Sequence, residues 1–310
     1  MKVGLIDVDN MGKTPSFPSL PLMKISAYHK ARGDQVDWWF PLSDRYDLVY
    51  QSKVFTFTPD LQYPVHADRK IMGGTGYGLN NFLIDEIEHA MPDYGLYGNQ
   101  FADTAFGFLT RGCPRGCPFC IVSEKEGRVS RQVADLSEFW NGQRNLKLLD
   151  PNLLACSQRD ALLRRLEKSG AWVDFTQGLD IRLMDREAAR LLSALKIRQI
   201  HFAWDNPKQD LSGAFRQFKV WSGIKDYRKL GVYVLTNYNS TQGEDLMRVY
   251  TLRDLGYSPY VMVYDKEHAP IEVRRLQRWC NNRIIFAACR LFENYNDLGD
   301  RRQCMKQLNG

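Results

Sequence analysis

The sequence contains no apolar run that approaches the roughly 18 residues of a membrane-spanning helix. It also contains no internal repeat and no low-complexity segment. The apolar run at the N-terminus is interrupted by Asp7 and Asp9, which favours a first β-strand over a signal peptide. We therefore expect a globular protein without a membrane span.

The composition is that of an ordinary globular protein. Hydrophobic residues make up 44% of the 310 residues and charged residues 25%. This length predicts one large and one small domain. The formal charge of +6 permits a nucleic-acid partner without requiring one. Because the cysteines are unevenly spaced and no targeting segment is recognised, we expect a cytoplasmic location, where thiols stay reduced and can bind metal.

Three of the seven cysteines lie in one short segment, Cys113-Pro-Arg-Gly-Cys117-Pro-Phe-Cys120. The next cysteine is Cys156 and the next histidine is His201, so no fourth ligand lies nearby. A structural zinc site needs four protein ligands in a closed tetrahedron. Three thiolates with one open position instead suit an iron–sulfur cluster that must bind something else. The spacing therefore predicts a catalytic cluster.

Cys-x3-Cys-x2-Cys with an aromatic residue before the last cysteine resembles the signature of the radical S-adenosylmethionine enzymes. The resemblance implies that Cys113, Cys117 and Cys120 bind three irons of a [4Fe–4S] cluster, while S-adenosylmethionine chelates the fourth iron. It also implies that Phe119 lies by the adenine. In that family the reduced cluster cleaves S-adenosylmethionine to a 5′-deoxyadenosyl radical, which abstracts hydrogen from a substrate.

Two alternative roles for these cysteines stay open. A zinc knuckle could be completed by a distant ligand such as His201 or Cys156, or the cysteines could be buried by coincidence. The glycines and prolines of the loop suit a backbone held near a cluster better than a packed core. The remaining four cysteines are too widely spaced to form a motif: Cys156, Cys280, Cys289 and Cys304.

Residues 1–99 are predicted to form a small Rossmann-like α/β domain. A helix is expected from Leu20 to Arg32, ending before Gly33. Strands are expected at Lys2–Val8, Gln35–Phe40, Leu48–Thr56 and Lys70–Gly74. Such a domain placed before a three-cysteine loop resembles the branch of the family that has an N-terminal cobalamin-binding domain.

Cobalamin itself is not clearly implied. The Asp-x-His-x-x-Gly motif that ligates cobalamin in that branch is missing, since the corresponding loop reads Asp7-Val-Asp-Asn-Met-Gly12. Some members of the branch bind cobalamin without that histidine, and others have lost the cofactor. The balance of these observations is against cobalamin in this chain.

Residues 100–310 are predicted to form a partial (β/α)6 barrel of the TIM type, the radical S-adenosylmethionine domain. Chemistry in such barrels lies at the C-terminal ends of the strands, and the three-cysteine loop follows the first of them. The expected strands are Thr104–Arg111, Leu146–Asp150, Val173–Gln177, Gln199–Trp204, Gly231–Asn237 and Pro259–Tyr264. The expected helices are Gln132–Trp140, Gln158–Lys168, Asp185–Leu195, Gly213–Leu230, Glu244–Leu255 and Ala269–Asn281.

Polar residues at the strand ends are candidate contacts of S-adenosylmethionine. Asp150 could accept a hydrogen bond from the ammonium group, or it could form an Asx-turn or a helix cap. Arg182 could bind a carboxylate, or it could pair with Asp180 or Asp185. The remaining candidates are polar groups suited to ribose, carboxylate or substrate, Gln177 and Asn237. His201 leads an apolar strand and is expected to be a core histidine.

The sequence thus predicts a radical S-adenosylmethionine enzyme that modifies its substrate by methylation, thiolation or rearrangement. The positive net charge and the domain order slightly favour a nucleobase in nucleic acid as the substrate over a small metabolite or peptide. The lack of an added C-terminal RNA-binding domain counts against a nucleic-acid substrate. The resemblance implies a reductant such as flavodoxin or ferredoxin. The competing hypothesis is a non-catalytic binding module whose cysteines hold a structural metal.

Overall fold

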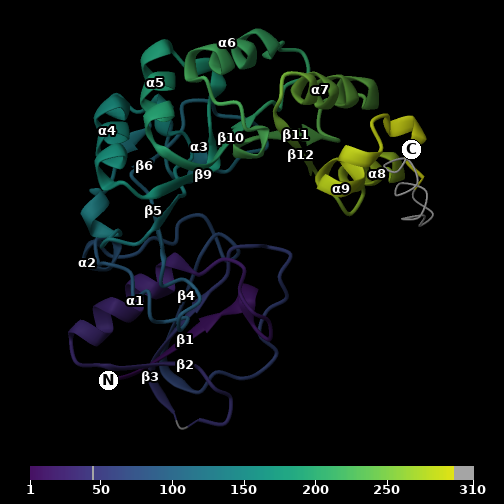
Figure 1. The fold of residues 1–310 in the computed structure, drawn as a ribbon. Helices are drawn as coiled ribbons and strands as arrows, with labels where there is room; N and C mark the ends of the chain where they lie inside the picture. Colours follow the sequence, from purple (N-terminus) through teal and green to yellow (C-terminus); the bar gives the residue numbers. More distant parts are fainter. Residues whose placement is uncertain (44, 297–310) are drawn as a thin grey trace. The chain divides into compact units, whose positions relative to one another are not determined.

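The computed structural model describes residues 1–43 and 45–296, so Cys304 lies outside the described residues. The chain divides into two compact units, Met1–Asp150 and a second that begins at Pro151. Both units are α/β with parallel sheets, which confirms the fold class (Figure 1). The predicted domain boundary near residue 99 falls between two sheets, since β4 ends at Gly73 and β5 begins at Thr104. That boundary stays a prediction, because the first compact unit continues beyond it.

The first unit is built on a four-stranded parallel sheet in the order β2-β1-β3-β4. Its strands are β1 (Lys2–Asp7), β2 (Gln35–Trp38), β3 (Tyr46–Ser52) and β4 (Ala67–Gly73). Helix α1 (Leu20–Ala31) buries Leu22 and Ile25 against Val3 and Leu5 of β1. This apolar contact places the predicted helix on the sheet of a Rossmann-like unit.

The first unit also holds short elements around the cysteines: α2 (Asp85–Glu88), β5 (Thr104–Gly107), β6 (Thr110–Arg111), α3 (Val122–Lys125), β7 (Arg131–Gln132) and β8 (Asn145–Leu148). β5 pairs in parallel with β8, and β6 pairs antiparallel with β7. The single strand predicted over Thr104–Arg111 is therefore wrong. It breaks after Gly107, where a Cβ atom would lie only 2.3 Å from the Phe139 ring.

The helix predicted over Gln132–Trp140 is also wrong. Gln132 belongs to β7, and only one 3-10 turn, Leu136–Glu138, follows. That turn is closed by a capping box between Asp135 and Glu138. The capping signal is present in the sequence, but it starts a single turn because the strand pairing before it takes the first residues.

The second unit contains a parallel sheet in the order β12-β11-β10-β9. Its strands are β9 (Trp172–Leu179), β10 (Lys196–Ala203), β11 (Leu230–Thr236) and β12 (Ser258–Val263). Its helices are α4 (Arg159–Ser169), α5 (Arg186–Ala194), α6 (Ser212–Ser222), α7 (Gln242–Asp254), α8 (Ile271–Asn281) and α9 (Arg283–Ala288). Strands alternate with helices, as the sequence predicts, while the curling of the sheet into a partial barrel stays a prediction.

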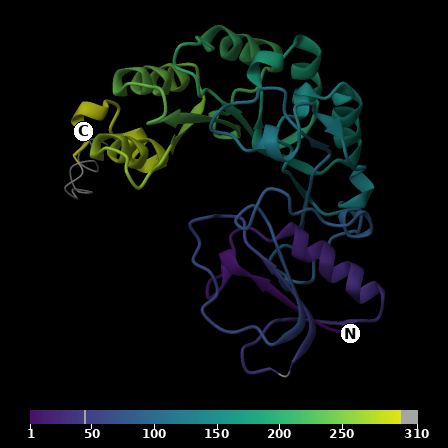
Figure 2. The same cartoon turned by 180° about the vertical axis from the view of Figure 1, so that it is seen from behind.

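Helices α4 to α7 lie along one side of the strands of the second unit (Figure 1 and Figure 2). The side chains that face these helices are fully buried, among them Val173, Ile200, Phe202 and Val232. The opposite face carries a stack of His201 on Tyr233, with ring centroids 4.8 Å apart. His201 Nδ1 lies 3.1 Å from the carbonyl oxygen of Phe175, which gives this histidine a packing role.

One predicted helix of the second unit is too long. The segment Gly213–Leu230 was expected to be helical throughout, but α6 ends at Ser222. Gly223 follows in the left-handed conformation with φ 64°, and its N–H bonds to the carbonyl of Lys219. A glycine in this conformation ends a helix because it costs no Cβ clash. In the described part of the chain, no helix is both long and apolar enough to span a bilayer.

Candidate metal centre

The three cysteines lie on a loop whose two ends are tied together. The Cys113 N–H donates to the carbonyl of Gly127 at 3.1 Å. The Gly112 N–H donates to Glu126 Oε2 at 3.2 Å, and Glu126 Oε1 accepts from Arg111 Nη1 at 2.9 Å. With the antiparallel β6–β7 pair beneath them, these bonds close the loop at its base.

The closed loop presents three thiols. Cys113 and Cys117 are half-buried, Cys120 is exposed, and none of them forms a disulfide. The Cys120 N–H donates to the carbonyl of Cys117 at 2.9 Å, which makes a tight turn around the half-buried Phe119. The adenine contact expected of Phe119 stays a prediction.

The donor set fits an iron–sulfur cluster. Over residues 1–43 and 45–296, no group of three His, Cys, Asp or Glu side chains is arranged to hold a metal ion. The segment Cys113–Cys120 offers three soft sulfur donors and no carboxylate or imidazole. These are the donors that a cluster binds.

The loop depends on a glycine at its first position. Gly112 has φ 90°, and a Cβ atom there would lie 2.2 Å from the carbonyl oxygen of Val129. Gly116 also has a positive φ, 56°, but its Cβ would meet only the flexible end of Arg128, at 3.2 Å. A side chain at Gly112 would therefore have to displace backbone, whereas one at Gly116 would displace only the end of a flexible side chain.

We expect Gly112→Ala to open the loop. The strained φ alone costs about 1–3 kcal/mol, and the clash with a backbone carbonyl adds to it. A cost of this size corresponds to a roughly ten-fold or larger loss of the closed loop. Iron bound per chain after anaerobic reconstitution measures the effect. Gly116→Ala is the matched control: it shares the positive φ but not the clash with a backbone carbonyl, so it should lose less iron than Gly112→Ala. Equal iron in both variants and the wild type would contradict the role of Gly112.

An ion-pair network fixes the strand that enters the loop. Arg111 pairs with Glu126 and, through Nη2, with Glu88 at 3.2 Å. Lys24, whose pKa is lowered by burial, also pairs with Glu88, at 3.3 Å. The guanidinium of Arg111 lies 3.9 Å from the centroid of the Phe108 ring, a cation–π contact. Sequence reasoning missed Arg111 and Glu126, because their partners are far away along the chain.

Asp150 anchors the same strand from the end of β8. Its carboxylate accepts hydrogen bonds from the Leu109 N–H at 3.2 Å and from the Thr110 hydroxyl at 2.7 Å, and it also accepts from the Thr110 N–H. Burial raises the pKa of Asp150 to about 6, although these hydrogen bonds act in the opposite direction. The contacts give Asp150 a positioning role just before the loop. Its proposed contact with the ammonium of S-adenosylmethionine stays a prediction.

The candidates of the second unit occupy the strand ends where the sequence places them. Arg182 Nε donates to Asp180 Oδ1 at 2.6 Å and its Nη1 to Gln209 at 3.2 Å, so the predicted alternative of an aspartate pair is present. Asn237 has φ 60° and donates from Nδ2 to the carbonyl of Tyr264 at 2.8 Å. Gln177 is exposed on β9. Their contacts with a cofactor stay predictions.

A buried arginine, which sequence reasoning missed, fixes two of these strand ends. Arg248 of α7 is fully buried and donates to the carbonyls of Trp204, Asp205 and Leu235. It also forms an ion pair with Asp245. It therefore holds the backbone that leaves β10 and β11. The only sequence signal is a charged pair, three residues apart, in the middle of a helix.

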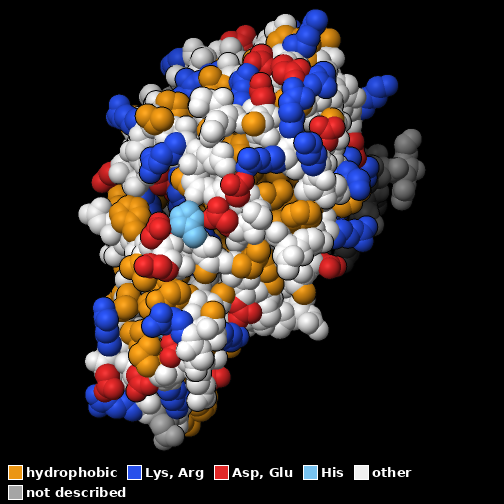
Figure 3. All heavy atoms as spheres, turned by 90° about the vertical axis from the view of Figure 1, so that its left-hand side faces the viewer, with side chains coloured by type: hydrophobic (Ala, Val, Ile, Leu, Met, Phe, Trp, Pro, Cys, Tyr) orange, Lys and Arg blue, Asp and Glu red, His pale blue; other side chains and the backbone are white. Residues whose placement is uncertain are grey.

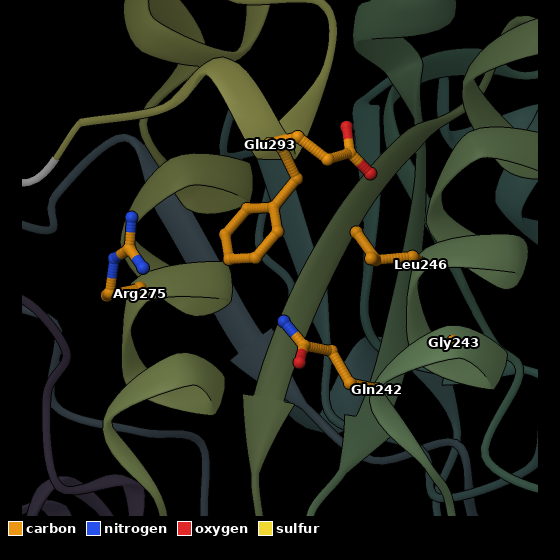
Figure 4. Close-up of a pocket in the computed structure, with 6 residues that line it drawn as sticks. Gln242, Gly243, Leu246, Arg275 and Glu293 are labelled. Atoms are coloured by element: carbon orange, nitrogen blue, oxygen red, sulfur yellow. The ribbon is translucent and has the colours of Figure 1, made fainter.

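A cavity of about 350 Å³ in the second unit is lined by the first turn of α7, α8 and the segment after α9 (Figure 4). Arg275, Gln242 and Glu293 supply its polar groups. The guanidinium of Arg275 is bound to the carbonyl of Tyr295 at 2.8 Å. The cavity thus carries both signs of charge and includes none of the predicted site residues.

Comparisons with known proteins bear on the fold. No family model matches the sequence, and no curated protein is significantly similar to it. The structure is similar to that of a radical S-adenosylmethionine methyltransferase, TsrM from Kitasatospora setae, with cobalamin and a [4Fe–4S] cluster bound. The TM-score is 0.58 at 14% sequence identity, over 85% of this chain and 75% of TsrM. The two chains share their overall fold.

This likeness confirms, at the level of the fold, the resemblance that the three cysteines suggest. A second structure of TsrM, with tryptophan substrate and an S-adenosylmethionine analogue bound, gives a TM-score of 0.43 at 13% identity, over 84% of this chain and 66% of that one. At such identities the comparison concerns architecture. The roles of individual residues rest on the contacts described above.

Proposed function

We propose that this chain is a radical S-adenosylmethionine enzyme that binds a [4Fe–4S] cluster at Cys113, Cys117 and Cys120. The observation that carries the proposal is a loop, tied at its base by hydrogen bonds of Gly112 and Cys113, that presents three thiols in a chain with this fold. When bound, the cluster and S-adenosylmethionine would supply a one-electron cleavage of the sulfonium, chemistry that belongs to the cofactors. The protein supplies binding, orientation and exclusion of water.

The residues around the loop have distinct tasks in this proposal. The three thiolates would hold the cluster, while Glu126 and Arg111 keep the loop closed. Asp150 fixes the strand before the loop through the Leu109 and Thr110 amides. A fixed loop is needed because a ligand set that moves would lose the open position at which S-adenosylmethionine binds.

The cofactor and partner proposals follow from the same resemblance. A reductant such as flavodoxin or ferredoxin would deliver the electron. TsrM has cobalamin bound in its solved structure, whereas the early loop of this chain lacks the ligating histidine, and the expectation against cobalamin stays a prediction. The reaction is methylation, thiolation or rearrangement. Arg182, Gln177 and Asn237 remain the proposed contacts for S-adenosylmethionine or substrate.

We propose a nucleobase-bearing substrate, with a small metabolite or peptide as the alternative. The net charge of +6 attracts an anionic partner. On the face shown in Figure 3, however, Lys and Arg side chains are interspersed with Asp and Glu. That face therefore shows no continuous basic stripe of the kind that a long phosphate backbone would need.

Anaerobic reconstitution tests the proposed function against the rival, a binding module with a structural metal. We expect iron and acid-labile sulfide in the protein, and 5′-deoxyadenosine after addition of S-adenosylmethionine and a reductant. The assay should be run with and without cobalamin. Stoichiometric zinc, without sulfide and without cleavage of S-adenosylmethionine, would support the rival and overturn the proposal.

A further inference from the structure

A second cavity lies in the first unit, away from the cysteine loop in sequence. It has a volume of about 340 Å³ and is lined by residues of β1 and β2 and of the loop after β1. The strand order of this sheet reverses between β1 and β3, and no residue of β3 lines the cavity. The cavity lies instead at the carboxyl ends of β1 and β2, at the edge of a parallel α/β sheet outside which ligands bind.

Three aromatic side chains line this cavity. Trp38 is the last residue of β2, Trp39 follows it, and Tyr97 comes from the segment before β5. Trp38 meets Tyr97 edge to face, with ring centroids 5.1 Å apart, and its Nε1 donates to the carbonyl of Leu96 at 3.2 Å. Trp38 is nevertheless 39% exposed. The indole ring is thus fixed in position while part of its surface stays exposed, and a flat ligand ring could stack on that part.

The cavity has one buried acid. Asp7, at the end of β1, is only 8% exposed. Its Oδ2 accepts from the Tyr97 hydroxyl at 2.7 Å and from Asn10 Nδ2 at 2.8 Å. The carboxylate also accepts from the Asn10 backbone N–H, so about one of its roughly four acceptor positions is left for a ligand. Lys13 lines the cavity too, and no other charged side chain does so in the described residues.

The enclosed volume of this cavity is smaller than a whole cobalamin. A corrin ring with its nucleotide tail is several times larger than 340 Å³. The loop that would supply the cobalt ligand, Asp7 to Gly12, forms part of the cavity lining and contains no histidine. The volume lies near the lower end of the range for small-molecule sites, about 300–1,000 Å³. It accommodates one or two fused rings with a small substituent.

We propose that this cavity is a ligand site for a planar nitrogen heterocycle of nucleobase to nucleoside size, which stacks on Trp38 and donates an N–H or O–H to Asp7. The aromatic lining selects a flat ring, and the buried carboxylate selects one that carries a hydrogen-bond donor. The site is separate from the proposed cluster chemistry and does not depend on it.

Binding of adenine and adenosine to the full-length chain tests this proposal, by tryptophan fluorescence or equilibrium dialysis. We expect saturable binding that Trp38→Leu weakens about 5- to 150-fold, the effect of losing one base–aromatic stack. Asp7→Asn should weaken it as well. Phe57→Leu is the control, because Phe57 is an aromatic residue of the same unit that is 81% exposed and does not line the cavity.

Three results would overturn the proposal: no saturable binding of either probe, binding that Trp38→Leu leaves unchanged, or tight binding of hydroxocobalamin that Trp38→Leu weakens. The last would make the site a corrin site. Circular dichroism shows whether each variant is folded, and Trp38→Leu removes a partly exposed side chain, so it keeps the test decisive if Asp7→Asn does not fold. Neither the cluster nor cleavage of S-adenosylmethionine enters the measurement, so its failure leaves the proposed function untouched.

Discussion

Cys117→Ala is expected to abolish cleavage of S-adenosylmethionine, with 5′-deoxyadenosine formation at least about a thousand-fold lower than in the wild type. A drop of that size corresponds to roughly 4 kcal/mol of lost transition-state stabilisation. The physical reason is that one iron of the cluster would lose its thiolate, and no further cysteine of the described chain follows Cys120 until Cys156. The measurement is 5′-deoxyadenosine per iron, under reducing and anaerobic conditions.

Cys156→Ala is the matched control. Cys156 is buried at 3% exposure beside the 3-10 turn Leu153–Ala155, so the variant removes a sulfur without touching the loop. It should bind a wild-type amount of iron and keep cleavage. If Cys117→Ala retained cleavage, the assigned ligand set would be wrong. If Cys156→Ala lost iron as completely as Cys117→Ala, a distant fourth ligand and a zinc-type site would be favoured instead.

Asp150→Asn is expected to change how stability depends on pH. In the folded protein the pKa of Asp150 is about 6 because the carboxyl is buried, against an ordinary value of 3.8. A raised pKa means that the folded state binds the proton more tightly than the unfolded state. The stability from this group is fully present below about pH 4 and is lost as the pH rises through about 6, by about 3 kcal/mol in total.

Urea unfolding between pH 4 and pH 7 measures this effect. The free energy of unfolding of the wild type should fall, relative to that of Asp150→Asn, by about 3 kcal/mol over this range. Asp103→Asn, at an exposed position before β5, controls for the loss of one negative charge. A difference between wild type and Asp150→Asn that is constant with pH would show that the Asp150 carboxyl does not titrate in this window.

Elements with a strong local signal were predictable from the sequence. Helix α5 begins after Asp185, whose side chain accepts from the Ala188 N–H, and helix α7 begins with the capping box of Thr241 and Glu244. The parallel strands of the second unit are apolar runs whose buried side chains face the helices. In each case the residues that decide the element lie within a few positions of one another.

The errors lie where distant contacts decide the backbone. The strand before the cysteine loop is broken because Asp150, about 40 residues later, takes the amide hydrogens of Leu109 and Thr110. The site follows the same rule. The three cysteines could be found from their spacing in the sequence. The hydrogen bonds of Glu126 to Gly112 and Arg111 could not, because they depend on how the chain after the cysteines folds back onto the strand before them.

The tie between Glu126, Gly112 and Arg111 has a consequence for maturation of the protein. It consists of hydrogen bonds and an ion pair within the polypeptide, which offset part of the entropy of ordering the ligand loop. A zinc finger behaves in the opposite way, because its metal drives folding. Metal binding therefore need not supply the whole free energy of ordering this loop.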